Sequence, residues 1–243
     1  MFAFEITTEK YDVDLAELAG RRLLTYPNAF TVLPADGGAR VTIEGDDAMQ
    51  LAAAATAAIL LKDLIYFELA GMADALPLEL NDKQHVLTEA LRAARDGAHE
   101  RSTRGQLMDY YSEYASLNLE GFLQFRMRRQ RDEWQEIVDR IAEERLMSRE
   151  YAELLGVLGA FASMQQPRME EISICINPDG SCTLTDDTNA RIEYVDCSED
   201  GIVGLLVSMA PAKLTVYDLS NGHGQKIADA IARVFSGRVR VYR

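Results

Sequence analysis

The sequence predicts an α+β protein in three parts. These are an N-terminal α+β unit (residues 1–80), a central helical segment (81–166) and a C-terminal module (167–243) that combines a β-hairpin with a β-α-β unit. Three observations predict this class. Short segments of alternating apolar residues occur near both ends of the chain, apolar residues follow helical spacing in the middle, and the composition changes abruptly after Pro167.

The N-terminal unit begins with Phe2, Phe4 and Ile6, whose alternation is typical of a strand with one buried face. The segments expected to follow are a helix over 15–23, strands over 30–33 and 41–43, and an alanine-rich helix from a cap at Asp46 or Asp47 to about Gly71. The residues between the two strands, 34–38, read PADGG. This pattern predicts a hairpin, because glycine supplies the positive φ that a tight turn needs.

The central segment is expected to be almost entirely helical. Pro77 ends the preceding helix, and Asn81 with Gln84 forms a capping-box pattern that predicts the start of the next one. The run from 117 to 167 predicts two consecutive amphipathic helices, the second capped by Ser148.

The C-terminal module opens with a predicted hairpin. Its strands, 172–176 and 182–185, flank a turn at Asn177–Gly180 that proline, aspartate and glycine all favour. The expected elements after it are a helix over 201–209 capped by Asp200, a strand over 213–217, a helix over 225–235 and a strand over 238–241. Strand, helix and strand at this spacing predict a right-handed parallel crossover.

Composition restricts the function classes. With 39 acidic and 25 basic residues the formal net charge is −14, which disfavours binding to a phosphate backbone. The N-terminus lacks a basic signal-peptide region, and the longest apolar run, Leu51–Leu61, is shorter than the roughly 20 residues that span a bilayer. The three cysteines form no CxxC pair, which suits a reducing compartment. We therefore expect a cytoplasmic protein without membrane insertion.

Several segments carry a resemblance to a known family. They are EGFLQFR (120–126), Glu150-Tyr151, QQPR (165–168), INPDGS (176–181), SMAPAKL (208–214) and VFSGRV (234–239). Together and in this order they resemble the YtxC-like family of sporulation-associated proteins from endospore-forming bacteria, although Ala212 stands where a lysine is expected. The resemblance implies a cytoplasmic protein linked to spore formation, and it brings no catalytic residues.

The arginines after EGFLQFR have two interpretations. Arg128 and Arg129 fall outside the apolar stripe of their helix and have Asp132 and Glu133 four residues on, so a solvated, ion-paired surface is expected. Arg126 lies at the edge of the stripe, where a guanidinium needs an acceptor. We expect the residues Glu120, Phe122, Phe125 and Arg126 to dock the helical segment onto the C-terminal module.

The loop between the last predicted strand and helix is a candidate anion site. It contains Asn221, Gly222, His223, Gly224 and Lys226. Glycines and a helix N-terminus can contact a phosphate, but Ile227 occupies the third glycine position of a dinucleotide fingerprint, and glycines also form turns with no ligand.

No pattern for a catalytic centre, a metal site or a cofactor is present: histidines are scattered, and GxSxG and HExxH are absent. Cys175 and Cys182 would be out of register in the hairpin, so core thiols are expected. The leading interpretation is a non-enzymatic interaction or regulatory protein with an unknown protein partner and an apolar docking patch that includes Trp134, Tyr110 or Tyr111. The alternative is a binder of a phosphate-bearing small molecule or nucleotide, or an enzyme acting on one, through residues 220–226. The oligomeric state is left open.

Overall fold

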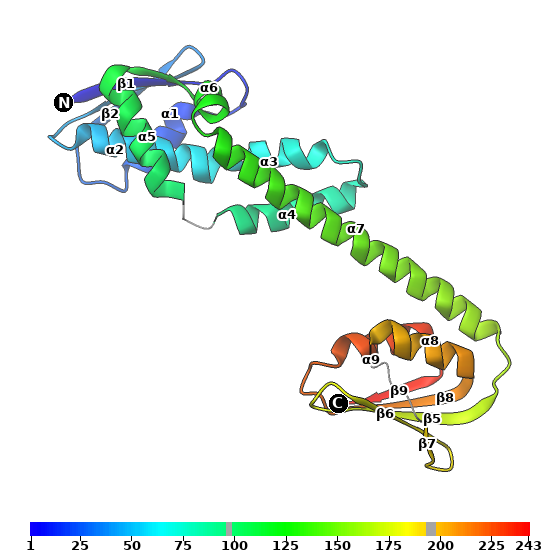
Figure 1. The fold of residues 1–243 in the computed structure, drawn as a ribbon. Coiled ribbons are helices and arrows are strands. Elements are labelled where there is room, and N and C mark those ends of the chain that lie inside the picture. Colours follow the sequence, from blue (N-terminus) through cyan, green and yellow to red (C-terminus); the bar gives the residue numbers. More distant parts are fainter. Residues whose placement is uncertain (96–98, 193–197) are drawn as a thin grey trace. The chain divides into compact units, whose positions relative to one another are not determined.

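The computed structural model describes residues 1–95, 99–192 and 198–243, and it confirms the α+β class (Figure 1). The chain divides into two compact units, Met1–Leu146 and Met147–Arg243. Each has its own sheet and its own apolar core, so each is described by itself.

The sheet of the first unit has the strand order β2-β3-β1-β4. Its strands are β1 (Phe2–Thr7), β2 (Phe30–Ala35), β3 (Gly38–Ile43) and β4 (Ser116–Asn118). The predicted β2–β3 hairpin is confirmed, with a turn shorter than expected because Pro34 and Ala35 continue the edge strand β2. The strand β4 was not predicted. It is only three residues long and pairs parallel to β1, with Glu5 opposite Ser116.

The helices of the first unit cover and extend its core. They are α1 (Leu15–Leu23), α2 (Ala48–Ala58), α3 (Ile65–Asp74), α4 (Leu80–Ala94), α5 (Glu100–Glu113) and α6 (Leu119–Phe125), with a π-helical turn η1 (Ile59–Leu64) between α2 and α3. By length and composition the stretch Ala48–Asp74 is apolar enough to cross a membrane, but 67% of its most apolar window is buried inside the unit. The predicted cap at Asn81 is wrong, since α4 begins at Leu80 after Glu79.

The long helix α7 (Arg128–Met164) corrects the prediction of a helix start at Ser148, which lies inside it. Pairs of arginine and glutamate four residues apart occur on both sides of Ser148, Arg140–Glu144 and Arg149–Glu153, and such pairs favour a continuous helix. The break falls instead at Arg126 and Met127, whose amides both donate to the carbonyl of Phe122.

The core of the first unit joins residues from 1–80 and from 81–146. Phe4 and Ile6 of β1, Leu60 and Leu64 of η1, and Val86 of α4 belong to one buried cluster. The apolar stripe predicted on the central helices is buried in the same cluster: Leu119, Leu123, Met127, Trp134, Val138 and Ile141. The separate domain boundaries predicted at 80 and 166 stay a prediction.

The second unit has a five-stranded sheet of order β7-β6-β5-β8-β9. Its strands are β5 (Met169–Ile176), β6 (Cys182–Asp186), β7 (Arg191–Ile192), β8 (Pro211–Asp218) and β9 (Val239–Tyr242). The antiparallel β5–β6 hairpin and the parallel β8–β9 pair confirm the predicted arrangement, and the short β7 was not predicted.

Two helices, α8 (Glu199–Met209) and α9 (Gln225–Val234), accompany this sheet (Figure 1). Ser198 caps α8 by accepting from the Gly201 amide, so the predicted cap at Asp200 is wrong. Cys182 lies opposite Ile176 and not opposite Cys175, so the two do not form a disulfide across the hairpin; Cys197 lies outside the described residues.

Candidate functional site

The segment Glu120–Arg126 forms the helix α6 and the turn that follows it. Asn118 caps the helix, because its side chain accepts from the Gly121 amide at 2.7 Å. Phe122 is buried, and its ring meets that of Tyr110 edge-on with centroids 5.9 Å apart. Phe125, by contrast, is 76% exposed, and Arg126 beside it is exposed as well. We call Phe125 and Arg126 the α6 corner.

Glu120 fixes the start of α6 to the loop after β1. Its Oε1 accepts from the Thr8 hydroxyl and the Glu9 amide, both at 2.6 Å, and from the Lys10 amide. Burial opposes ionisation of this carboxyl, but the hydrogen bonds from Thr8 and the backbone outweigh it and lower its pKa. Its Oε2 is buried without a hydrogen-bond partner among the described residues.

A buried carboxylate, Glu68 of α3, anchors the first turns of α7. Its Oε2 accepts from Arg131 Nε at 2.9 Å, and its Oε1 accepts from the Tyr11 hydroxyl at 2.6 Å and from Lys10. Burial raises the pKa of Tyr11, and its bond to Glu68 raises it further. This network joins α3, α7 and the loop after β1. It therefore holds the start of α7, which directly follows the α6 corner, in place.

Arg126 lines two grooves in the first unit. One, of about 270 Å³, is lined by Tyr110, Leu117, Asn118, Gly121, Phe122, Phe125 and Arg126. The other, of about 250 Å³, is polar and includes His99, Gln106, Arg129 and Glu133. Arg126 has no ion-pair partner in the part of the chain that the structure describes, whereas Arg129 pairs with Glu133 at 3.2 Å as predicted. The docking role predicted for Arg126 stays a prediction.

Two of the three aromatic residues expected in an exposed docking patch are buried. Trp134 faces the core as part of the α7 stripe, and Tyr111 is buried with its hydroxyl 2.9 Å from that of Thr56. Burial raises the pKa of Tyr111. Of the expected residues, only Tyr110 borders the groove beside the α6 corner.

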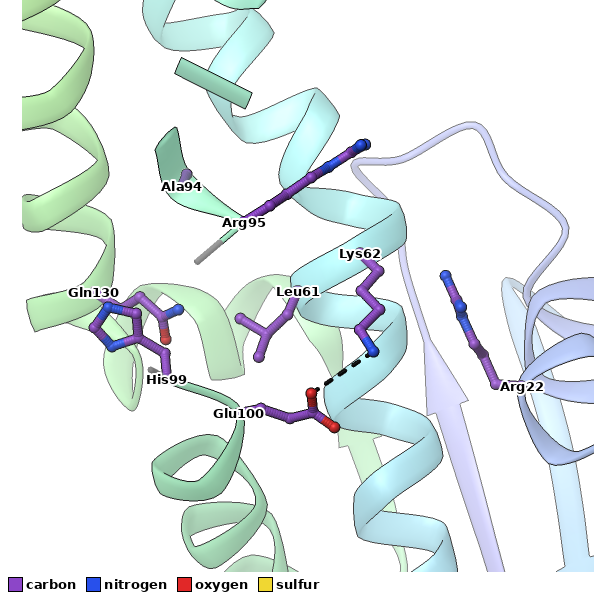
Figure 2. Close-up of a pocket in the computed structure, with 8 residues that line it drawn as sticks. All are labelled: Arg22, Leu61, Lys62, Ala94, Arg95, His99, Glu100 and Gln130. Atoms are coloured by element: carbon purple, nitrogen blue, oxygen red, sulfur yellow. Dashed lines mark ion pairs between the residues drawn. The ribbon is translucent and has the colours of Figure 1, made fainter. Parts of the chain in front are cut away.

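A larger cavity, of about 500 Å³, lies elsewhere in the first unit (Figure 2). Its lining consists of Arg22, Leu61, Lys62, Ala94, Arg95, His99, Glu100 and Gln130. Four of these side chains can be cationic and one is a carboxylate, so the lining is basic within an acidic protein. We call it the basic cavity.

The side chains of the basic cavity that can be cationic differ in how they are paired. His99 Nε2 lies 3.1 Å from Glu133 Oε2. Arg22 contacts Asp63 through two hydrogen bonds of 2.9 and 2.7 Å, and Lys62 lies 3.6 Å from Glu100, the contact drawn in Figure 2. Arg95 has no ion-pair partner among the residues described. The lining comes from α1, η1, α4, α5 and α7, and because its residues are dispersed in sequence no motif signals it.

The predicted anion loop is built around a carboxylate. Ser220 Oγ donates to Asp218 Oδ1 and accepts from the Gly224 amide, so these groups are engaged within the loop. Gly224 is required for packing, since a Cβ there would lie 2.6 Å from Ile176 Cγ2. Asn221 and Gly222 have positive φ, and four of the predicted residues are exposed: Asn221, Gly222, His223 and Lys226. Anion binding at this loop stays a prediction.

Comparison with known proteins identifies a family. The model of the YtxC-like family matches residues 78–240, which is more than half of the chain and includes the α6 corner and the whole second unit up to β9. No curated protein and no solved structure matches the chain. The chain belongs to the YtxC-like family.

Proposed function

We propose that this YtxC-like protein is a cytoplasmic, sporulation-associated interaction protein without enzymatic activity of its own, and that it binds a protein partner at the α6 corner. Family membership supports the link to sporulation. The observation that carries the proposed role is the exposure of Phe125 directly beside Arg126, whose guanidinium has no ion-pair partner among the described residues.

The α6 corner has the chemistry of a binding hot spot. Aromatic side chains and arginine are enriched at the centres of protein interfaces, where they fill pockets and pair with carboxylates. The cap at Asn118 and the bonds of Glu120 hold α6 in place before any partner arrives. Binding to a preorganised surface loses less conformational entropy. The partner segment should present an apolar side chain to Phe125 and a carboxylate to Arg126.

The test compares three baits in lysate from sporulating cells. Wild-type protein should retain one near-stoichiometric partner, and Phe125→Ala should reduce its recovery at least tenfold, which corresponds to a loss of about 1.4 kcal/mol. Leu24→Ala is the matched control, because Leu24 is 74% exposed at the end of α1 and lies outside the corner. Equal recovery by all three baits would exclude the corner as the binding surface.

The second candidate function is binding of a small anionic ligand, and the basic cavity favours it. Its volume and its excess of cationic side chains suit a phosphate-bearing molecule. A ligand that binds only the folded state raises the melting temperature. Millimolar nucleotide should raise it for wild type and for Lys226→Ala, but not for Arg95→Ala, if the cavity is the site. A shift abolished only by Lys226→Ala would assign the ligand to the loop at 220–226 instead.

A further inference from the structure

An exposed apolar row runs along the part of α7 that belongs to the second unit. Its apolar members are Met147, Leu154, Val157, Phe161 and Met164, with exposures between 50% and 78%. With Glu150 included, consecutive positions are separated alternately by three and four residues. This is the spacing of positions a and d in a heptad, and it forms a straight seam on one side of a helix.

The packing of the adjoining side of α7 fixes how this helix is rotated. Leu155 and Ala162 are buried in the core of the second unit, and Tyr151 and Leu158 pack against the same core. The Tyr151 hydroxyl donates to Glu199 Oε1 of α8 at 2.6 Å. The row lies beside this packed side and stays exposed, so covering it requires no change in the fold of this unit.

We propose that the row is the contact surface of a symmetric homodimer, in which α7 of a second copy lies antiparallel across it. The row is self-complementary about a midpoint between Leu155 and Gly156. Around this midpoint Leu154 faces Val157 of the second copy, Glu150 faces Phe161, and Met147 faces Met164. Each of these contacts occurs twice, as a two-fold symmetric interface requires.

The position of Glu150 selects the antiparallel orientation. In a parallel pair at the same register the two Glu150 carboxylates would face each other across the seam, and like charges in such a position repel. In the antiparallel pair each Glu150 meets the ring of Phe161, whose edge carries partial positive charge.

The seam spans Met147–Met164, which at 1.5 Å per residue is a contact roughly 27 Å long. A contact of this size suits a reversible dimer, and the net charge of −14 on each copy opposes association. We expect a dissociation constant at the weak, micromolar end of the range for protein interfaces. Added salt should strengthen the dimer, because it screens the repulsion between the two acidic chains while the apolar contact remains.

Sedimentation of the full chain tests the dimer. Wild type should pass from 27.1 kDa to twice this mass as its concentration rises. Val157→Asp should raise the dissociation constant at least tenfold, because the added carboxylate enters the seam twice. Leu24→Asp places the same charge on an exposed apolar site outside the seam and should leave the constant unchanged. A monomer at every concentration, or equal dimerisation of all three proteins, would overturn the proposal.

Disulfide trapping tests the orientation. Under mild oxidation, a mixture of the Met147→Cys and Met164→Cys variants should form a mixed cross-linked dimer, while wild type under the same conditions controls for the native cysteines. Cross-links within Met147→Cys alone, with none in the mixture, would demonstrate a parallel pair and overturn the antiparallel assignment.

Discussion

Glu68 is a buried carboxylate whose two oxygens are shared among three donors from distant parts of the first unit. Burial works against its charge, but the hydrogen bonds from Lys10 and Tyr11, with the nearby charge of Arg131, lower its pKa below the ordinary value. Lys10 is about half exposed and Arg131 about one third, so water still solvates the cations when the carboxylate is removed. The loss is therefore smaller than for a fully buried pair.

We predict that Glu68→Ala lowers the free energy of unfolding by about 1.5–3 kcal/mol at neutral pH, the range for hydrogen bonds to charged groups. Because the folded-state pKa is depressed, the contribution is complete above the unfolded pKa, near 4.5, and disappears as the pH falls through the lower folded value. Urea unfolding at several pH values should therefore show the variant and wild type converging in acid.

The matched control is Glu153→Ala, which removes an exposed partner of Arg149 at 3.1 Å. Exposed pairs of this kind contribute about 0.3–0.5 kcal/mol, so its effect should be small. A gap between Glu68→Ala and wild type that stays constant down to the acid transition would show that Glu68 acts through packing and not through its charge.

At the level of elements, the pattern of apolar residues was sufficient to predict a strand or helix wherever that segment has one buried face. It placed the strands at Phe2–Ile6 and in both hairpins, and it identified the stripe of α7 that enters the core. The pattern failed where pairing with a distant segment decides whether residues form a strand. The strand β4 forms because three residues pair with the edge of β1. The local sequence of Ser116–Asn118 contains no signal that predicts this pairing.

Helix ends were harder to predict than helices. Ser148 has the residue type of an N-cap, but the chain continues as helix through it, and the break falls at Arg126 and Met127 where no cap residue stands.

The candidate functional sites also differ in how far the sequence predicts them. The α6 corner lies in a segment that the sequence singled out, whereas the basic cavity collects side chains from five elements and becomes visible only when the first unit is folded.

At the level of the whole molecule, the chain has two separate apolar cores, and the boundary between them lies within the helix α7. The buried cluster of the first unit ends with Ile141 and Ala142, and that of the second begins with Leu155, although α7 runs through both. Each cluster is formed by side chains of one sheet and of the helices packed against it. This is the arrangement of an independent cooperative unit. The α6 corner belongs to the first unit and the proposed dimer seam to the second, so one can be changed without removing residues of the other.

Leu214 allows this independence to be tested in the full chain. It lies on β8 with no exposed surface, between β5 and β9, and contacts only the second core. Leu214→Ala should destabilise that unit by about 2–5 kcal/mol, through lost apolar burial and the cavity left behind. Measured by hydrogen exchange, amides in 169–242 should exchange faster while those of β1 and β3 keep their protection. Equal acceleration in both sheets would show that the two cores unfold together, and a change at Leu214 would then also compromise the α6 corner.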